Sequence, residues 1–554
     1  MKRIVFILCL IVASVSGCLK ETPKSSTTAQ NYYRSVAQIR TGLNGCYQPL
    51  RSIYATRGFW FMTEVGTDLM FISGSTMYDA NCDVSPAKPS VATTLWVNGY
   101  KGVMYTNEII EDINYSIENG YVTKDEVQAS IAEAVVLRAM YYYVLTCSFG
   151  DVPFYTDKVT EQNRASIACL PRMNAYETRK YCIDEVKTWI LEGQHLPLVR
   201  TYDANAGQVG AAVGLMVAAK MAMWNEAWDD VLSFVEALEG IYGDYSSADK
   251  YEQFASDYPL TDVPFSVKFA RESILEMENK FEDYGTQVTS IIAAYAAPLR
   301  RSLSSDNEDV EGGASLYVEN YDGILIPELG AYSRITSTVR PTAYFYKQLM
   351  PYYSEDLRNG TYSNGSSVAR GSSGTLAWRW KGYDAANDSG MTNEKVMWFA
   401  SSSSATSRPW MGEKFWCWGM RDQMDDNNYK IFRFSDALLM KAEALLNLNR
   451  CDEACNYLNI TRTRAALGQV TYAGGASSKV SLMEEIRKER ARELVGEFQR
   501  KFDLVRWNIW YERTKMYNES TSLQSNIREY HRYWPIPADQ VSYSGGALDN
   551  NEYK

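Results

Sequence analysis

Histidine is nearly absent from this chain of 554 residues, which contains only His195 and His531. The two lie far apart in the sequence, and each stands near a proline in a stretch without helical periodicity. A multi-histidine zinc site needs several such side chains, and a histidine-based catalytic triad needs one held beside its partners. The sequence therefore argues against both kinds of site, and we predict no metal ligands and no cofactor.

Other signatures of enzyme chemistry are also missing. The chain has no Gly-x-Ser-x-Gly elbow, phosphate-binding loop or Cys-x-x-Cys pair. Cys451 and Cys455 stand four residues apart on a predicted helix; buried free thiols are the preferred interpretation, and a disulfide or half a metal site is the alternative. An all-helical glycoside hydrolase stays as an alternative, since it needs only two carboxylates about 5 to 10 Å apart. We predict no catalytic residue and no enzymatic activity.

Basic residues are too few to make a nucleic-acid partner plausible. The chain has 56 Lys and Arg against 67 Asp and Glu, a formal net charge of −11, whereas phosphate binding needs basic patches. Beyond the N-terminus, no stretch approaches the length of about 18 consecutive apolar residues that indicates a transmembrane helix.

The N-terminus itself is apolar. A short positive segment precedes the run Ile4 to Val15, a pattern typical of a secretory signal and too short for a transmembrane helix. The following Ser-Gly-Cys step resembles a lipobox, which implies cleavage before Cys18 and stable anchoring by more than one acyl chain on its thiol. We predict a signal peptide over residues 1–17 and a lipidated flexible tether over 18–30. An ordinary signal peptide with a chance cysteine is the alternative.

Aromatic residues are abundant, with 40 Tyr, 14 Trp and 18 Phe. Their flat faces suit stacking on sugar rings, but large helical folds also use them for packing, and we assign most of them to packing. Helical periodicity is strong over residues 31–50, 96–117 and 125–149. The last of these stops where Gly150 precedes a proline, and the phase of the second places Trp96 in the core.

Two later segments, 215–238 and 438–458, each read as helix, short turn and helix, which resembles a tetratricopeptide repeat without a regular 34-residue period. The stretch between them is rich in Gly, Ser, Asn and Tyr, and loops on a rigid scaffold commonly carry binding sites. We predict a mainly α fold, with tetratricopeptide-like helix pairs forming a right-handed helical scaffold in a single large domain. Its parts are an N-terminal helical scaffold over 31–242, a loop-rich insertion over 243–425 and a C-terminal helical part over 426–554.

Four motifs in a fixed order behind the lipobox resemble the SusD/RagB family. They are the helix 132–143 with its Gly-Asp-Val-Pro stop, the helix 432–444 with the Asn-x-x-Arg-x-Arg-Ala step at 459–465, the charged segment 486–507, and Trp-Pro-Ile-Pro at 534–537. The resemblance covers both ends of the chain and hardly the middle. Gly496 stands where an aromatic is common in the family and Phe498 where a small residue is usual, so we expect local packing to differ there.

The charged segment also has a plain physical interpretation. Apolar residues give its helix one buried side, and Glu484 and Lys488 can pair one turn apart. We interpret the remaining charges as a solvated face with structural ion pairs.

The resemblance implies a lipoprotein exposed on the surface of the outer membrane. Such a protein captures oligosaccharides and delivers them to a SusC-like TonB-dependent transporter. A peptide-binding member of the family is one alternative, and an adhesion lipoprotein that binds protein through its repeat helices is another.

Ligand-binding residues are expected in loops outside the helical stripes, where aromatic platforms and amide or carboxylate groups can meet sugar hydroxyls. Trp378 and Trp380 are spaced to point the same way on a strand. For each candidate, plain packing is the alternative. The full set is Trp60, Asp68, Tyr78, Asn81, Asp83, Tyr284, Tyr295, Trp378 and Trp380.

Overall fold

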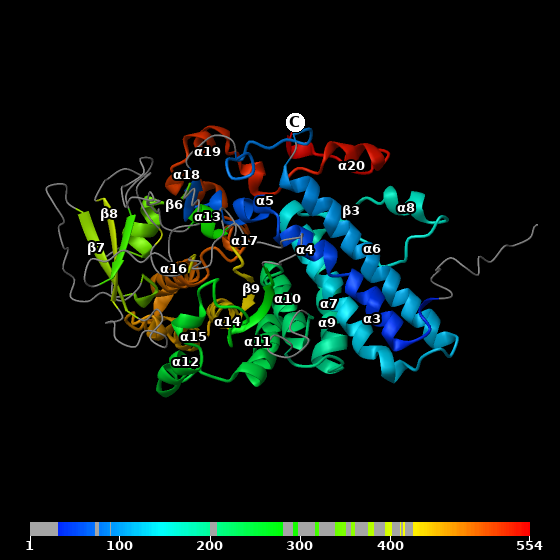
Figure 1. The fold of residues 1–554 in the computed structure, drawn as a ribbon, viewed down its shortest axis with the longest axis horizontal. Helices are drawn as coiled ribbons and strands as arrows, with labels where there is room; N and C mark the ends of the chain where they lie inside the picture. The colour runs from blue at the N-terminus through cyan, green and yellow to red at the C-terminus, as the bar shows by residue number, and fades with distance from the viewer. Residues whose placement is uncertain are drawn as a thin grey trace, which may run out of the picture.

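The computed structural model has a mainly helical body with small two- and three-stranded sheets (Figure 1), as the sequence predicts. The strands β7 and β8 project at the end of the molecule opposite to α3. The structure describes residues 32–72, 77–88, 90–199, 208–280, 292–296, 316–320, 338–350, 356–359, 375–381, 394–400, 410, 414–415 and 425–553.

The N-terminal scaffold is built on two long helices, α6 (Val91–Glu118) and α7 (Lys124–Phe149). The helix expected over 31–50 is instead two helices, α3 (Val36–Gly45) and α4 (Gln48–Tyr54). The expectation of one helix is wrong because Pro49, in the first turn of α4, has no N–H to continue the preceding helix.

Local signals fix both ends of α7. Thr123 and Glu126 form a capping box, in which Glu126 accepts hydrogen bonds from the backbone N–H and the hydroxyl of Thr123. At the other end Gly150 has a φ of +72° and stops the helix. The predicted bounds of 125–149 are therefore confirmed to within one residue.

The two predicted helix pairs are present, and their turns have the same geometry. In each, one residue between the helices takes a left-handed conformation: Glu226 with φ +54° and Asn449 with φ +63°. Alanines line the contacts between the helices, and α11 of one pair packs against α14 of the other. The pairs are α10 (Ala211–Trp224) with α11 (Trp228–Tyr242), and α14 (Phe434–Asn447) with α15 (Cys451–Arg464).

The C-terminal part continues in helices that pack back onto the scaffold (Figure 1). The turn between the first two explains the departure from the family pattern: Gly496 has a φ of +84°, and a Cβ there would lie 2.4 Å from the Phe415 ring. Only glycine fits this space and conformation. The helices are α16 (Gly475–Glu493), α17 (Arg500–Arg506), α18 (Trp510–Tyr517), α19 (Thr521–Asn526) and α20 (Ala538–Tyr543).

Small antiparallel sheets tie distant segments together. Ile72 pairs with Val339, so the segment after Asp68 runs beside the end of the middle region. The pairings are β1 (Met70–Ile72) with β6 (Val339–Pro341), β2 (Val152–Pro153) with β3 (Arg172–Met173), β4 (Ser273–Met277) with β9 (Tyr429–Arg433), and β8 (Glu394–Ala400) between β5 (Leu316–Asn320) and β7 (Thr375–Lys381).

Short helical elements fill the connections. They are α5 (Arg57–Trp60), α8 (Arg164–Ala168), α9 (Ala175–Val186), α12 (Tyr251–Asp257) and α13 (Ile292–Ala296), the π-helices η1 (Phe61–Val65), η2 (Lys187–Glu192) and η6 (Phe345–Leu349), and the 3₁₀ turns η3 (Ala248–Lys250), η4 (Leu260–Asp262), η7 (Leu357–Asn359), η9 (Glu529–Arg532) and η10 (Asn551–Tyr553).

Aromatic side chains supply much of the core, as expected. Tyr141 and Tyr142 of α7 are fully buried, and Trp96 packs edge-on against Phe149. Cys451 and Cys455 are buried free thiols, which confirms the preferred interpretation. Within the described part of the chain, no helix combines the length and apolar character needed to cross a membrane.

Candidate ligand-binding surface

The short helix α5 lies close to two other segments. Its Gly58 approaches Asp79 of the loop over 77–88, and its Arg57 contacts Tyr295 of α13. Gly58 makes the approach of the loop possible, because a Cβ there would lie 2.7 Å from Val91 Cβ and 3.1 Å from Asp79 Oδ2. The accessible side chains at this junction belong to Arg57, Tyr78, Asp83, Lys88 and Tyr295. We name these five residues the Tyr78–Tyr295 surface.

Arg57 holds one side of this surface. Its Nη1 donates a hydrogen bond to the Tyr295 hydroxyl at 2.7 Å, and its guanidinium lies 5.7 Å from the centre of the same ring. Tyr295 also packs edge-on against Phe61 of η1, with ring centres 5.3 Å apart. The Tyr295 ring is thus fixed by contacts on two sides and stays half-exposed.

Tyr78 forms the other side. The Lys88 ammonium lies 4.1 Å from the centre of its ring and forms an ion pair with Asp83. The Asp83 backbone N–H donates to the Tyr78 carbonyl at 3.0 Å, which closes the loop. Tyr78 is 44% exposed, so a rigid loop presents one face of a large ring to solvent.

Asp79 attaches the loop over 77–88 to the body of the protein. Its carboxylate accepts hydrogen bonds from the first N–H of α6, at Val91, at 3.1 Å and from Trp534 Nε1 at 3.3 Å. Burial raises the pKa of Asp79, whereas these hydrogen bonds and the nearby charge of Arg57 favour its ionised form. Asp79 therefore joins the loop to both α6 and the C-terminal Trp-Pro motif.

Two of the predicted ligand residues are wrong as platforms, because their side chains lie inside the molecule. Trp60 is buried, and its Nε1 donates to the Gly496 carbonyl at 3.0 Å. Asp68 is buried as well and accepts two hydrogen bonds from Arg500, at 2.6 and 2.8 Å. Burial opposes ionisation, but Arg500 and Arg513 keep the pKa of Asp68 below its usual value. Both residues hold the N-terminal segment onto α17 and α18.

Asn81 is also buried and has a structural role instead of the predicted one. Its side-chain oxygen accepts from the Ser520 hydroxyl at 2.7 Å, and its carbonyl accepts from Asn526 at 3.2 Å. A polar residue in a loop satisfies neighbouring backbone as readily as it meets a ligand, so composition alone does not separate the two roles.

The remaining candidates belong to the middle of the chain. Tyr284 lies outside the described residues. Trp378 and Trp380 lie on β7 as predicted, where they pair with Met397 and Lys395 of β8, and their side chains are outside the described part. Of the nine candidates, Tyr78, Asp83 and Tyr295 are the ones whose side chains the structure describes as accessible.

Sequence reasoning missed the two cations of this surface. Arg57 immediately precedes Gly58 and three successive aromatic residues, and Lys88 follows Asp83 by five residues. The available signal was a cation adjoining an aromatic run in a loop, a pattern that favours cation–π contacts.

A buried ion-pair cluster lies elsewhere, where α16 meets β9 and α15. Arg433 contacts Glu272 at 2.9 Å, Glu493 at 3.0 Å and Glu497 at 2.8 Å, and Arg464 contacts the first two of these at 2.8 and 2.7 Å. Burial raises the pKa of a carboxyl, but here the attraction of the neighbouring guanidiniums is stronger. It keeps the pKa of Glu272 and that of Glu493 below their usual values. The cluster comprises Glu272, Asp356, Arg358, Lys414, Arg433, Arg464, Glu489, Glu493 and Glu497.

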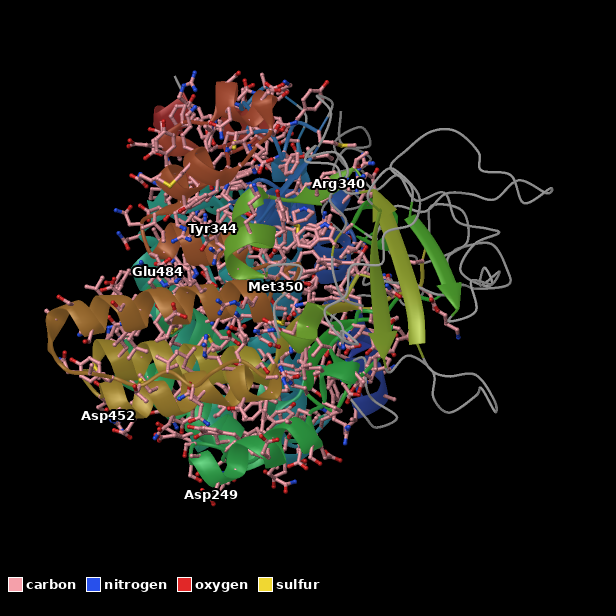
Figure 2. All side chains as sticks on the ribbon, turned by 90° about the vertical axis from the view of Figure 1, so that its left-hand side faces the viewer. Asp249, Arg340, Tyr344, Met350, Asp452 and Glu484 are labelled. Atoms are coloured by element: carbon pink, nitrogen blue, oxygen red, sulfur yellow. The ribbon has the colours of Figure 1, made fainter. Side chains whose placement is uncertain are left out.

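The interpretation of the charged helix as a solvated face is therefore wrong for its C-terminal half, where Glu489 and Glu493 are fully buried. The expected pairing of Glu484 with Lys488 is also wrong. Lys488 pairs with Glu485 at 2.9 Å, and Glu484 pairs with Arg513 of α18 at 2.8 Å. Figure 2 shows Glu484 on α16 beside η6, whose neighbour Tyr344 also accepts a hydrogen bond from Arg513. Glu484 thus has a partner on another helix, whereas Lys488 keeps a local one.

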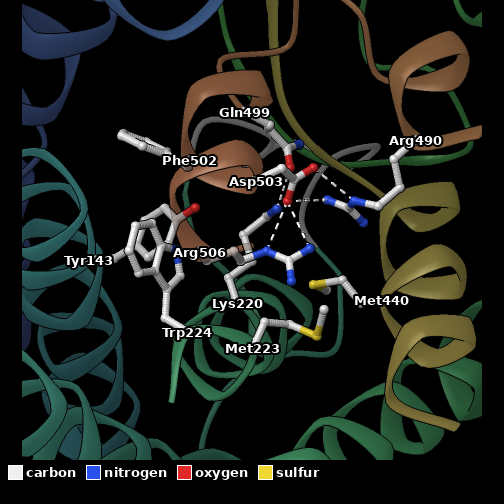
Figure 3. Close-up of a pocket in the computed structure, with 10 residues that line it drawn as sticks. All are labelled: Tyr143, Lys220, Met223, Trp224, Met440, Arg490, Gln499, Phe502, Asp503 and Arg506. Carbon is white, nitrogen blue, oxygen red and sulfur yellow. Dashed lines mark hydrogen bonds and ion pairs between the residues drawn. The ribbon is translucent and has the colours of Figure 1, made fainter. Parts of the chain in front are cut away.

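A second group of charges surrounds a small cavity between α10, α14 and α17, and Figure 3 shows Arg490 directed at Asp503 there. Arg490 pairs with Asp503 at 2.8 Å and with Asp436 at 2.9 Å, and Lys220 pairs with Asp436 at 2.5 Å. The cavity holds about 10 Å³, which is room for one water molecule at most. These paired charges stabilise the joint between helices, and the cavity is too small for a ligand.

Glu64 of η1 joins the N-terminal segment to α17. It is fully buried, and its carboxylate accepts hydrogen bonds from the backbone N–H groups of Gly496, Gln499 and Arg500 at 2.9, 2.6 and 3.1 Å. Burial nevertheless raises its pKa to about 7. The carboxyl is thus held by one rigid turn and not exposed to a substrate.

An open groove of about 750 Å³ lies between α12 and the end of α15. Its volume fits a ligand, but its lining, which includes Glu252, Leu260 and Gln469, contains no aromatic side chain. Within the described residues, no three His, Cys, Asp or Glu side chains gather as metal ligands. The Tyr78–Tyr295 surface is the better candidate for sugar recognition because it combines aromatic faces with hydrogen-bonding groups.

Two family profiles match the chain. That of the SusD family matches residues 344–553, and a second, described as starch-binding associating with outer membrane, matches residues 19–207. Among individual proteins, SusD-like protein P25 of Formosa agariphila is 23% identical over 99% of both chains, and SusD-like protein P2 of the same organism is 22% identical over 99% of both.

Solved structures share the fold. Surface glycan-binding protein A from Bacteroides uniformis superposes with a TM-score of 0.61 at 20% identity, covering 94% of this chain and 100% of the other. The surface glycan-binding protein A from Bacteroides thetaiotaomicron, in complex with laminarihexaose, gives 0.60 at 17% identity, covering 93% and 99%. Profiles, relatives of full length and fold agree with the motifs of both chain ends, and the chain therefore belongs to the SusD/RagB family.

Proposed function

We propose that this protein captures oligosaccharides at the Tyr78–Tyr295 surface and is not an enzyme. One observation carries the proposal: two tyrosines with accessible rings, each oriented by a cation, lie on segments that both approach α5, where a Cβ at Gly58 would lie 3.1 Å from Asp79 Oδ2. Aromatic faces stack on the apolar faces of sugars, and the neighbouring hydroxyl, carboxylate and cationic groups suit sugar hydroxyls.

The relatives support this choice of ligand class. The structural neighbour from Bacteroides thetaiotaomicron holds laminarihexaose, a glucose oligosaccharide, and others carry the name surface glycan-binding protein. The buried carboxylates of this chain support a scaffold role, since those of the ion-pair cluster face guanidinium or ammonium groups and not a cavity.

Binding and stacking can be tested together on a glycan array followed by calorimetry. We expect Tyr78→Ala to weaken binding about 3- to 10-fold, the range expected for one aromatic stacking contact. Tyr176→Ala is the matched control, because Tyr176 on α9 is similarly exposed at 46% and lies on another helix.

Equal binding by both variants would place the ligand elsewhere. Binding of peptides but not glycans would favour the peptide-binding alternative. Shortening of the bound oligosaccharide during incubation, followed by chromatography, would revive the hydrolase.

We further propose that the protein is a surface lipoprotein of the outer membrane and works with a SusC-like TonB-dependent transporter. The signal peptide over 1–17, the lipidated tether over 18–30 and the domain over 31–554 then form its three functional parts, and the loop-rich stretch 243–425 contributes to the ligand face. The profile described as associating with outer membrane supports this placement.

Cys18→Ala should abolish labelling by a radioactive fatty acid and release the protein from the membrane fraction. Purification of the native protein from detergent-solubilised outer membranes should bring a large barrel protein with it. Retention of the variant in the membrane, or purification of the protein alone, would contradict these two parts of the proposal separately.

A further inference from the structure

Arg57 differs from the arginines of the buried ion-pair cluster in that no carboxylate of the described residues forms an ion pair with it. Among the described residues its one hydrogen bond goes from Nη1 to the Tyr295 hydroxyl. A guanidinium carries five N–H donors, so the others face solvent at this exposed residue. The charge of Arg57 is therefore available to a ligand.

The acidic side chains around Arg57 are already engaged. Asp79 accepts from Val91 N and Trp534 Nε1 beneath the surface, and Asp83 pairs with Lys88. Arg57 is thus the cation of this surface that forms no ion pair with a carboxylate of the described residues, although Asp79 lies near it.

Tyr295 supplies a second hydrogen-bond donor beside Arg57. Its hydroxyl oxygen accepts from Arg57, and its own O–H hydrogen has no acceptor among the described residues. A fixed guanidinium beside a free phenolic O–H suits a group with several anionic oxygens, because charge-assisted bonds from arginine are strong and directional.

We propose that the glycan bound at this surface is acidic, and that Arg57 and the Tyr295 hydroxyl bind its carboxylate or sulfate ester while the Tyr78 ring stacks on a neighbouring sugar. This inference rests on the proposed function and names its ligand class. A uronic acid and a sulfated sugar present the same chemistry to Arg57, a planar or tetrahedral set of anionic oxygens.

The test is an array of neutral, uronate-bearing and sulfated oligosaccharides probed with the intact protein. Two matched pairs sharpen it: hexagalacturonate against its methyl ester, and a carrageenan hexasaccharide against its desulfated form. We expect an acidic member of the array to bind about ten-fold or more tightly than its neutral counterpart, as charge-assisted hydrogen bonds imply. The preference should shrink as salt rises, because screening weakens exposed charges. A preference for uronate and a preference for sulfate both support the proposal, and each identifies which anionic group the surface binds.

Arg57→Gln should reduce the ratio of the dissociation constants of the neutral and acidic members from about ten to about one, whatever the variant does to the binding of each. Arg34→Gln is the matched control, since Arg34 is also exposed, lies 4.9 Å from the centre of the Tyr121 ring and precedes α3 at another part of the molecule. Binding of neutral glycans alone, or equal effects of the two substitutions, would overturn the acidic-ligand inference and leave the proposed function standing. Absence of any glycan binding would overturn the proposed function itself.

Discussion

The buried ion-pair cluster and the Tyr78–Tyr295 surface use the same residue types in opposite ways. In the cluster, Arg433 is enclosed and touches three carboxylates between 2.8 and 3.0 Å. At the surface, Arg57 is exposed, lies beside two aromatic rings and, within the part of the chain that the structure describes, forms no ion pair with a carboxylate. A paired guanidinium stabilises a joint between helices, whereas an unpaired one beside aromatic rings is free to meet a ligand.

Removal of a cation from the buried cluster should have the largest effect on stability. Arg433→Met leaves Glu272, Glu493 and Glu497 with less compensation in a buried site. We expect a loss of about 3–5 kcal/mol in the free energy of unfolding, the usual cost of an uncompensated buried charge. Urea denaturation followed by circular dichroism measures it.

The control for this variant is Arg450→Met, which removes an exposed pair with Glu453 and should cost about 0.5 kcal/mol or less. Similar losses in the two variants would mean that the cluster contributes no more than a surface pair does, and the structural half of the comparison would fail.

A second test uses the pH dependence of a carboxyl that has no cationic partner bonded to it. Burial raises the pKa of Glu64 to about 7 from an ordinary value of 4.5. The folded protein therefore binds this proton more tightly than the unfolded chain. The resulting stabilisation is complete below about pH 4.5 and is lost as pH rises to about 7. The cluster carboxylates, whose pKa values are lowered, act in the opposite sense and lose their contribution as pH falls.

Glu64→Gln isolates the first effect. Between pH 4.5 and 7, the unfolding free energy of the natural protein should fall by up to about 3 kcal/mol relative to that of the variant. Parallel stability curves for the two proteins over this range would show that Glu64 has an ordinary pKa in the folded state.

Helices, their ends and the family were predictable because their signals are local or periodic. The capping box at Thr123, the stop at Gly150 and the helix pairs all follow from residues within a few positions of one another. The predicted pairing of Glu484 with Lys488 was wrong because Arg513 pairs with Glu484 from another helix. No local sequence pattern predicts that contact.

The candidate surface was predictable only in part for the same reason. Trp60, Asp68 and Asn81 look like Tyr78 and Asp83 in the sequence, since all are polar or aromatic residues between two helices. Their burial is decided by the packing of α17 and α19 from more than 400 positions away. Arg57 was not predicted because its significance depends on its forming no ion pair with a described carboxylate, which only the folded chain reveals.

A smaller loss of stability is expected when the loop over 77–88 is pushed away from α5. Gly58→Ala places a Cβ 2.7 Å from Val91 and 3.1 Å from Asp79, so the loop must shift. We expect a loss of about 1–3 kcal/mol in stability, as for other overpacked sites, together with weaker glycan binding. Gly240→Ala is the control, because a Cβ there meets nothing within 4 Å and should stabilise α11 by up to about 1 kcal/mol. Unchanged glycan binding by Gly58→Ala would show that the two halves of the surface need not be held together.

The smallest stability effect is expected at Arg57 itself. Arg57→Gln removes exposed contacts with two rings and one hydrogen bond to Tyr295, worth about 1 kcal/mol or less in total. Thermal denaturation should therefore place this variant close to the natural protein and far from Arg433→Met. A loss as large as that of Arg433→Met would make Arg57 a structural residue, and its effect on glycan binding could then be read as unfolding. A small loss leaves any change in preference between acidic and neutral sugars as a direct measure of the charge that Arg57 presents to solvent.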